Sequence, residues 1–233
     1  MGVRDLTLVA QEAMRPGAAP GRAKRRGPRH GADESLAGSQ EKRVSRGLVR
    51  ADHPLRDYLT AAEVERLLAA ARSSPRHGLR NYAMLLIAYR HALRASELTH
   101  LKLSDIDFAA RGIYCRRLKG SVSNVHPLAQ DELKVLAELR DCRPGAAGDH
   151  VFVSERGGPM TRYGIWHVVR EAGAGAGLGR EIHPHMLKHA AGYYFANKGL
   201  DVRLIQEYMS HVQIMNTIRY TRVDARRFAG MWA

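Results

Sequence analysis

The stretch YRHALRASELTHLKLSDID, residues 89–107, decides the fold. Its pattern predicts a short helix from Arg94 to Leu101, followed by a β-favouring run that starts at Asp105. Arg94 and Glu97 are three residues apart and therefore share one helix face. An Arg–Glu pair at this spacing is usually a surface ion pair, so its meaning depends on the sequence on either side.

Two helices are predicted before this stretch. Thr60 suits an N-cap, and Glu63, three residues later, completes a capping box. Val64 and Leu67 then begin an apolar pattern with helical spacing. A second helix is expected to follow Gly78 and to run into the deciding stretch.

Short β-favouring runs separated by Gly-containing turns follow the deciding stretch. They predict a small antiparallel meander. Its strands are expected at 105–108, 113–119 and 122–127. Helical patterns return at 128–139, 161–172, 184–198, 201–209 and 213–220, and a short strand is expected at 151–153. The fold class is therefore mainly α with a small three-stranded antiparallel β-sheet.

Charge is the strongest signal in the composition. The 233 residues carry 37 Lys and Arg against 23 Asp and Glu, a formal net charge of +14. This balance favours polyanionic partners, nucleic acid first and an anionic membrane surface second. The longest apolar run, 82–89, is far too short for a membrane span, which needs about 20 residues. Cys115 and Cys142 have no disulfide-framework spacing and are expected to be reduced thiols of a cytosolic protein.

Residues 1–51 differ in composition from the rest. They contain no Phe, Tyr, Trp or Ile and carry 11 Lys and Arg against 5 Asp and Glu. Such a segment buries too little apolar surface to offset the entropy of ordering, so it is expected to be a disordered basic tail. Attraction to DNA phosphates and an extension without a role are equally open interpretations.

Two other patterns are not taken as functional sites. The run GAGAGLG at 173–179 does not fit G-x-G-x-x-G and follows a helix, so it is read as a flexible connector. His183, His185 and His189 are close in sequence, but the segment HMLKH lacks the Glu of H-E-x-x-H. No metal site is therefore expected.

Residues suited to phosphodiester cleavage occur in four segments. A phosphodiester resists attack because of its own negative charge. A site without metal therefore needs several cations, a nucleophile and an acid for the leaving oxygen. The segments are RASE (94–97), LKGS (118–121), HPHMLKHA (183–190) and GLDVRLIQEYMSHVQIMNTIRY (199–220).

In order and spacing these segments resemble the tyrosine recombinase, or phage integrase, family. That family places its nucleophilic Tyr nine residues after a His, the separation of His211 and Tyr220. The resemblance covers about 55–232 and is strongest to the fimbrial phase-variation recombinases. It implies a catalytic domain at 52–233 without a core-binding domain.

The resemblance implies a role for each matching residue. Tyr220 would attack phosphorus to form a 3′-phosphotyrosyl link, and Lys119 would protonate the leaving 5′ oxygen. Glu97 would orient its neighbours. The phosphate would be held by Arg94, His185, Lys188 and His211, with His185 also a candidate proton acceptor. Arg116, Arg117 and Arg162 are further candidates for DNA backbone contacts, and equally plausible as solvated charges.

This sequence departs from the family pattern at two positions. Lys188 stands where the family has an Arg, and a mobile point charge replaces a planar bidentate fork. Ser210 stands where the family has a Gly, which is expected to strain the turn before His211. Loss of one such donor costs roughly a hundred- to a thousandfold in rate, so reduced activity is expected.

The function implied is site-specific recombination by inversion or integration, without cofactor or metal. The partners would be double-stranded DNA with inverted repeats and three further copies of the chain in a homotetramer. The protein would act in the cytoplasm, on the bacterial nucleoid, and not on a membrane. Two alternatives stay open: an inactive DNA-binding regulator on the same scaffold, and a topoisomerase-like enzyme that relaxes any supercoiled DNA.

Overall fold

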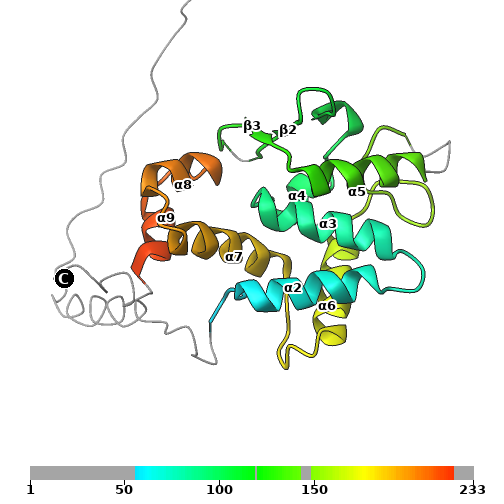
Figure 1. Ribbon diagram of the computed structural model, residues 1–233, viewed down its shortest axis with the longest axis horizontal. Helices are drawn as coiled ribbons and strands as arrows, with labels where there is room; N and C mark the ends of the chain where they lie inside the picture. Colours follow the sequence, from blue (N-terminus) through cyan, green and yellow to red (C-terminus); the bar gives the residue numbers. More distant parts are fainter. Residues whose placement is uncertain (1–55, 119, 143–147, 223–233) are drawn as a thin grey trace, which may run out of the picture. The chain divides into compact units, whose positions relative to one another are not determined.

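The computed structural model describes residues 56–118, 120–142 and 148–222 (Figure 1). The expected tail at 1–51 and the expected general acid Lys119 lie outside these ranges. Within them the chain is mainly helical and carries one three-stranded antiparallel sheet, which confirms the predicted fold class. No helix among the described residues is long and apolar enough to cross a membrane.

The helices follow the predicted order closely. They are α2 (Ala61–Arg72), α3 (Gly78–Arg90), α4 (Ala95–Leu98), α5 (Gln130–Asp141), α6 (Arg162–Gly175), α7 (Pro184–Asn197), α8 (Val202–Tyr208) and α9 (Met215–Ile218), with 3-10 turns η2 (Leu103–Asp105) and η3 (Arg219–Arg222). The helix predicted at 213–220 is instead a single α turn that tightens into η3. Short 3-10 turns commonly end helices in this way.

The predicted capping box begins α2. The Thr60 hydroxyl accepts a hydrogen bond from the backbone N–H of Glu63 at 3.3 Å. The Thr60 backbone N–H donates in return to Oε2 of Glu63 at 2.8 Å. Glu63 also pairs with Arg56, which secures the chain segment before the helix.

The sheet has the order β1 (Ile106–Asp107), β2 (Gly112–Cys115) and β3 (Asn124–Pro127). Ile113 of β2 lies opposite His126 of β3, and both are buried. The strand predicted at 151–153 is wrong. Val153 forms only an isolated bridge with Pro159 and no ladder.

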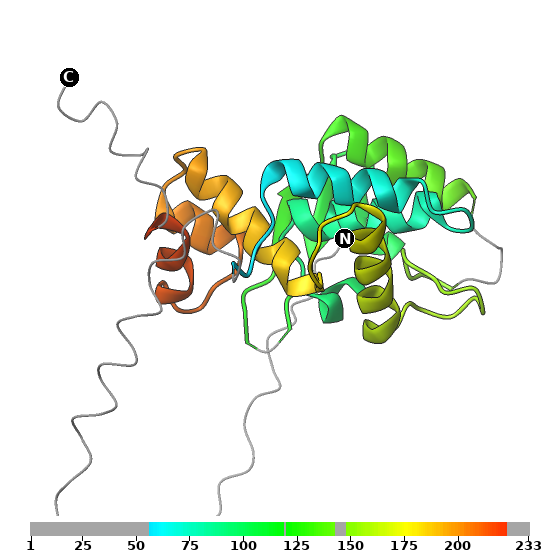
Figure 2. The ribbon, with the colours of Figure 1, turned by 90° about the horizontal axis from the view of Figure 1, so that it is seen from below.

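Helix α3 forms the centre of the main core. It is apolar along most of its length and packs against α2, α5 and α7. Figure 2 shows α7 (gold) running between α2 and α6 on one side and α8 and α9 on the other. A second, smaller core is formed by Tyr58, Ala92, Ala191, Tyr193, Ala196, Ile205, Met209 and Tyr220. Because α7 contributes to both cores, its side chains reach the end of α3 and η3 alike.

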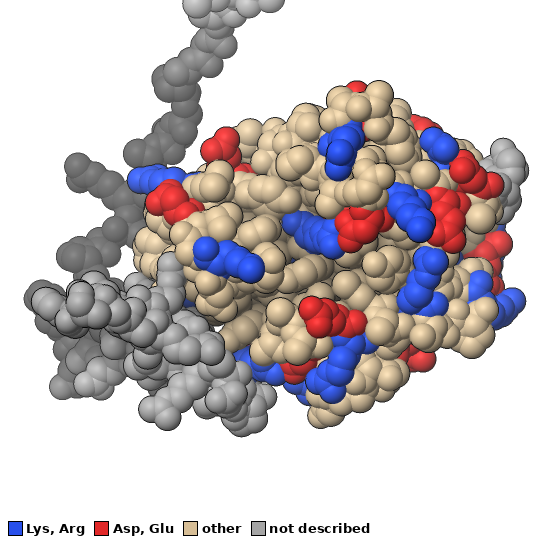
Figure 3. Space-filling view, in the orientation of Figure 1, with Lys and Arg blue, Asp and Glu red and all other residues tan. Residues whose placement is uncertain are grey.

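One face of the molecule carries mixed charge. On the face drawn in Figure 3, Lys and Arg side chains are interspersed with Asp and Glu. Among the described residues, Arg90 forms a bidentate pair with Asp131 at 2.7 and 2.6 Å. The excess of positive charge therefore does not form a single basic surface on this face.

Candidate active site

Arg94 is fixed by the first turn of α4. It is the N-cap residue of that helix, and its backbone N–H donates to Oε2 of Glu97 at 2.7 Å. Its Nη1 donates to Oε1 of the same carboxylate at 2.8 Å. The Arg94 side chain is 31% exposed while that of Glu97 is 1% exposed. Glu97 thus holds Arg94 from within and leaves part of the guanidinium accessible.

Arg117 also pairs with Glu97, but from the interior. Its Nη1 lies 3.0 Å from Oε2 of Glu97, and its side chain is 0% exposed. The guanidinium makes five hydrogen bonds, all inside the protein. The acceptors are the carbonyls of His91, Ala92 and Tyr208, the Glu97 carboxylate and the Ser210 hydroxyl.

The expectation that Arg117 contacts DNA is therefore corrected. Every N–H of its guanidinium fork points to a protein acceptor, and burial removes it from the surface. The charge of Arg117 also affects Glu97. Burial by itself would raise the pKa of Glu97, but the Arg94 backbone N–H and the charges of Arg117, Lys188 and Arg94 lower it below its ordinary value.

Arg116, the neighbouring residue, has a different environment. Its side chain is half exposed, and Nη2 pairs with Asp105 at 2.9 Å. The guanidinium also lies over the ring of Tyr114. An exposed pair of this kind contributes little to stability. Arg116 thus remains accessible for a DNA contact.

Lys188 is almost fully buried on α7. Its Nζ donates to the carbonyl of Ala92 at 2.7 Å and to that of Met209 at 3.2 Å. The ammonium thus connects the turn before Arg94 to the turn before His211. Burial and the positive charge of Arg117 lower the pKa of Lys188 to about 7. A group with this pKa changes its charge near neutral pH.

An open cavity of about 450 Å³ lies beside Arg94. It is lined by residues of α4, of the loop after β2, of α6 and of the start of α7. We call it the phosphate pocket; its principal lining residues are Arg94, Leu118, Ser121, Arg162, Trp166, His183 and His185. Arg162 and Arg94 make this pocket suited to an anion. Leu118 and Ser121 flank Lys119 in the sequence.

His185 stands at the pocket because Pro184 begins α7 there. Proline at the first helical position has a preformed φ and no N–H to satisfy. Burial, and then the charges of His183 and Arg94, lower the pKa of His185. In the protein without DNA, His185 is therefore neutral at pH 7.

His211 follows a strained turn at the end of α8. Ser210 has a φ of 53°, in the left-handed region where glycine is favoured, as expected for the residue in the family's Gly position. Nδ1 of His211 lies 2.9 Å from Oγ1 of Thr217. Burial and the charges of Lys188 and Arg94 lower the pKa of His211 to about 4.

Tyr220 lies on η3 and is only 2% exposed. Its hydroxyl is 3.0 Å from Nδ1 of His189. Its ring is stacked near His211 at a centroid distance of 6.1 Å and meets Tyr193 edge-on at 5.0 Å. Burial raises the pKa of Tyr220 well above its ordinary value, although the charge of Arg219 opposes this shift. We call His189, Gly192, Tyr193 and His211 the tyrosine seat.

Comparison with known proteins assigns the family. The model of the phage integrase family matches residues 57–227. The chain belongs to the phage integrase family. The type 1 fimbriae regulatory protein FimB of Escherichia coli (strain K12) is 44% identical over 186 residues, which are 78% of this chain and 92% of that protein. The type 1 fimbriae regulatory protein FimE of the same strain is 42% identical over 181 residues, 76% of this chain and 91% of that protein.

Solved structures show the same fold. XerA recombinase matches with a TM-score of 0.66 and 29% identity over 75% of this chain. XerH site-specific recombinase bound to its difH substrate matches with a TM-score of 0.63 and 24% identity over 77% of this chain, a likeness in fold alone. The chain spans 63% of XerA and 54% of XerH. The protein is a site-specific tyrosine recombinase.

The sequence did not predict that His189 lies beside Tyr220 in the site of this recombinase. Its pattern suggested only a possible metal ligand. His185 and His189 are four residues apart on α7, and their rings stack at 6.2 Å with an interplanar angle of 25°. The spacing was a signal that both residues share one face. It did not show that the face points at Tyr220.

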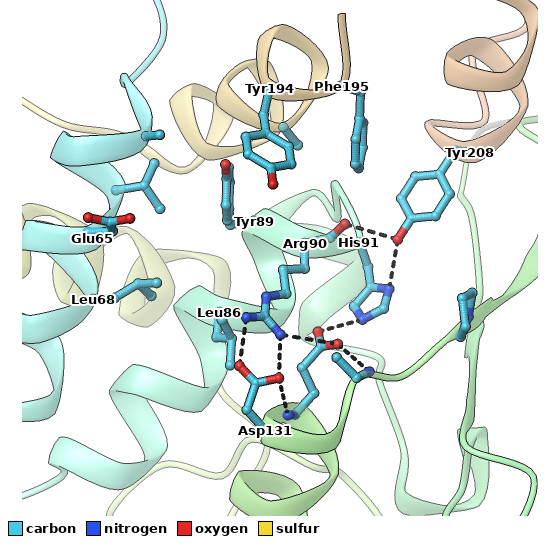
Figure 4. Close-up of a pocket in the computed structure, with 16 residues that line it drawn as sticks. Glu65, Leu68, Leu86, Tyr89, Arg90, His91, Asp131, Tyr194, Phe195 and Tyr208 are labelled. Atoms are coloured by element: carbon cyan, nitrogen blue, oxygen red, sulfur yellow. Dashed lines mark hydrogen bonds and ion pairs between the residues drawn. The ribbon is translucent and has the colours of Figure 1, made fainter. Parts of the chain in front are cut away.

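A second cavity, of about 480 Å³, is lined by residues that include Tyr89, Arg90, His91 and Tyr208 (Figure 4). The Tyr208 hydroxyl donates to the carbonyl of Arg90 at 3.1 Å, and Nε2 of His91 lies 3.0 Å from Oε1 of Glu132. These contacts connect α8 and α5 to the end of α3. The recombinase thereby holds the turns that present Arg94 and His211 in a fixed relation.

His91, Cys115 and His126 form a buried cluster that the sequence did not predict. One donor atom from each lies within 4.8 Å of the others. Nδ1 of His91 is 3.1 Å from Nδ1 of His126, and its Nε2 contacts Glu132. Both nitrogens of His91 thus have protein partners, and its backbone carbonyl accepts a hydrogen bond from Nη2 of Arg117.

Proposed function

We propose that this recombinase cuts and rejoins DNA through a 3′-phosphotyrosyl bond to Tyr220. The observation that carries the proposal is the convergence of distant segments. Nζ of Lys188 donates to the carbonyls of Ala92 and Met209, and Arg117 joins Glu97, the partner of Arg94, to Ser210 beside His211. The ring of Tyr220 stacks near that of His211. These contacts bring the segments of Arg94, Lys188, His211 and Tyr220 together.

The cleavage step moves one proton at each end. The phenol of Tyr220 gives its proton to a neighbouring base, its oxygen forms a bond to phosphorus, and the bond from phosphorus to the 5′ oxygen breaks. Lys119 gives its proton to that 5′ oxygen. Arg94, together with His185, Lys188 and His211, stabilises the negative charge on the non-bridging oxygens. The phosphotyrosine conserves the bond, so rejoining needs no external energy source.

The reaction outcome that we propose is inversion between inverted repeats. The support is the similarity to two fimbriae regulatory proteins over 91–92% of their length. Strand exchange between two sites would require a tetramer on DNA, acting in the bacterial nucleoid. Arg116 and Arg162, both accessible, would contact the DNA backbone.

The test is a nicked suicide duplex that carries the inverted repeats. The wild-type protein is expected to form a covalent protein–DNA band, and Tyr220→Phe is expected to form none. Tyr220→Phe removes one hydroxyl and about 1 kcal/mol of stability, so its fold is retained and circular dichroism checks this. A wild-type protein that binds the repeats and never forms the band would contradict the proposal.

A binding-only regulator is the second candidate. It is favoured by one observation, that both hydrogen bonds of the Lys188 ammonium go to protein carbonyls. If Lys188→Arg forms the covalent band where the natural protein does not, the natural protein is a weakened catalyst. If the protein relaxes supercoiled DNA without paired sites, the topoisomerase-like alternative holds instead.

A further inference from the structure

The tyrosine hydroxyl, His189 and Asp57 form a chain of contacts. Nδ1 of His189 lies 3.0 Å from the Tyr220 hydroxyl; when the hydroxyl donates, that nitrogen is unprotonated and Nε2 carries the hydrogen. Nε2 of His189 faces Oδ2 of Asp57 at 3.8 Å. Arg219, the residue before the tyrosine, pairs with the same oxygen at 2.6 Å. The proposed nucleophile Tyr220, the base His189 and the carboxylate of Asp57 thus lie in a row in space.

The fold leaves room for Tyr220 at this place. A Cβ at Gly192, three residues after His189 on α7, would lie 2.5 Å from Cε2 of Tyr220. The edge-on ring of Tyr193 closes another side. The phenol is therefore seated by helix α7 itself, with its hydroxyl directed at His189.

Burial keeps His189 neutral, within a ring of charged and titratable groups. Asp57 faces it from the segment before α2, Arg219 and Tyr220 from η3, His211 from the turn after α8, and His185 and Lys188 from its own helix. Burial lowers the pKa of His189 to about 4; the charge of Asp57 opposes this shift, and the charges of Arg219, His185 and Lys188 add to it. A neutral imidazole is available at pH 7 to accept a proton.

His185 occupies a different place. It lines the phosphate pocket with Arg94, and no hydrogen bond joins it to Tyr220 among residues 56–118, 120–142 and 148–222. We propose that His189, and not His185, accepts the phenolic proton of Tyr220 during cleavage, and that Asp57 is its positioning residue. The inference rests on the proposed function of Tyr220 as nucleophile.

During cleavage the O–H bond of Tyr220 breaks and its proton binds Nδ1 of His189. The electron pair of the phenolic oxygen forms the new bond to phosphorus. The bond to the 5′ oxygen breaks, and that oxygen takes its proton from Lys119. The resulting imidazolium is stabilised by Asp57 and returns the proton to Tyr220 when the strand is rejoined.

The experiment measures single-turnover adduct formation on the suicide duplex from pH 5.5 to 8.5. His189→Asn keeps an acceptor near Nδ1 but has no basic nitrogen, and we expect it to be about 10²–10⁴-fold slower. Its rate relative to wild type should rise about tenfold per pH unit, because the tyrosinate fraction rises in that proportion. Added imidazole should restore part of the rate in His189→Ala. His167→Asn, an exposed histidine of α6, is the matched control.

A second substrate separates this role from that of Lys119. A duplex with a bridging 5′-phosphorothiolate has a leaving group that needs no acid. His189→Asn should stay slow on this substrate, since the defect lies at the nucleophile. The inference is overturned if the rate of His189→Asn relative to wild type does not change with pH, or if this variant cleaves the phosphorothiolate at the wild-type rate. It is also overturned if the variant cleaves faster than wild type, because His189 would then restrain Tyr220.

A measurement without DNA keeps this inference distinct from the proposed function. Side-chain ¹⁵N spectra should show His189 as the neutral Nε2–H tautomer, with an Nδ1 signal that moves in Tyr220→Phe. An Nδ1–H tautomer would overturn the inference. If the spectra agree and the wild type forms no adduct on any duplex, the proposed function fails and the seat is only structural.

Discussion

The phosphate pocket is open to solvent, whereas the tyrosine seat is buried. Arg94 and Arg162 line an open cavity, whereas Tyr220 is 2% exposed and hydrogen-bonded to His189. A pocket for a phosphate must be open because DNA arrives from solvent. The tyrosine seat is buried, and burial keeps the phenol protonated because it raises the pKa of Tyr220. The residues proposed to bind phosphate and the proposed nucleophile thus lie in separate environments that meet at α7.

The buried Arg117 and its exposed neighbour Arg116 offer the sharpest test of this contrast. Arg117→Ala removes one of the two arginine partners of the buried Glu97 carboxylate and the donor to the carbonyls of His91 and Tyr208. Removing one partner of a buried pair costs about 3–5 kcal/mol, so we expect the largest loss of unfolding free energy here, measured by urea denaturation. Arg116→Ala, at the exposed neighbour, should change it by less than about 1 kcal/mol. Equal losses in both variants would contradict the burial of Arg117.

Arg94→Ala tests the open side. The guanidinium is partly exposed, so stability should hardly change, while removal of one donor to the phosphate should slow adduct formation about 10²–10³-fold. Single-turnover kinetics on the suicide duplex measure the rate. A variant that is unfolded and not merely slow would show that Arg94 belongs to the core.

Gly192→Ala tests the seat. The added Cβ would meet the Tyr220 ring at 2.5–2.7 Å. Alanine favours a helix interior by about 1 kcal/mol, so we expect the ring to be displaced and the helix to persist. Displacement by about 1 Å can cost about 10²-fold in rate, with little change in melting temperature. Gly175→Ala, where a Cβ has 3.5 Å of room, is the control and should cleave normally.

Lys188 lies between the two regions and should give the smallest effect. Its pKa of about 7 means that it loses its charge as the pH rises through neutrality. If the charged form holds the phosphate, the rate at subsaturating DNA should fall by up to about tenfold from pH 7 to 8, since that measurement reports on the free protein. Lys188→Arg keeps its charge, so its rate should not change from pH 7 to 8. If the rates of both proteins change with pH in the same way, the charge of Lys188 does not contribute to the reaction.

Most of the fold was predictable because local signals agree with one another. The capping box at Thr60, the proline that begins α7 and the Gly-containing turns of the sheet each act within a few residues. The strand at 151–153 was wrong because β-propensity depends on a partner, and here only one bridge forms. The tail at 1–51 and Lys119 lie outside the described residues, and their roles stay predictions.

By itself the sequence determined which side chains this recombinase has for the chemistry, and the order and spacing that identify the family. Only the tertiary structure decided which arginine is exposed and which histidine contacts the tyrosine. The buried Arg117 donates a hydrogen bond to Ser210, 93 residues away, and His189 contacts Tyr220, 31 residues away. Neighbours in sequence share composition and periodicity. Their burial and pKa depend on contacts between distant segments, which no local pattern encodes.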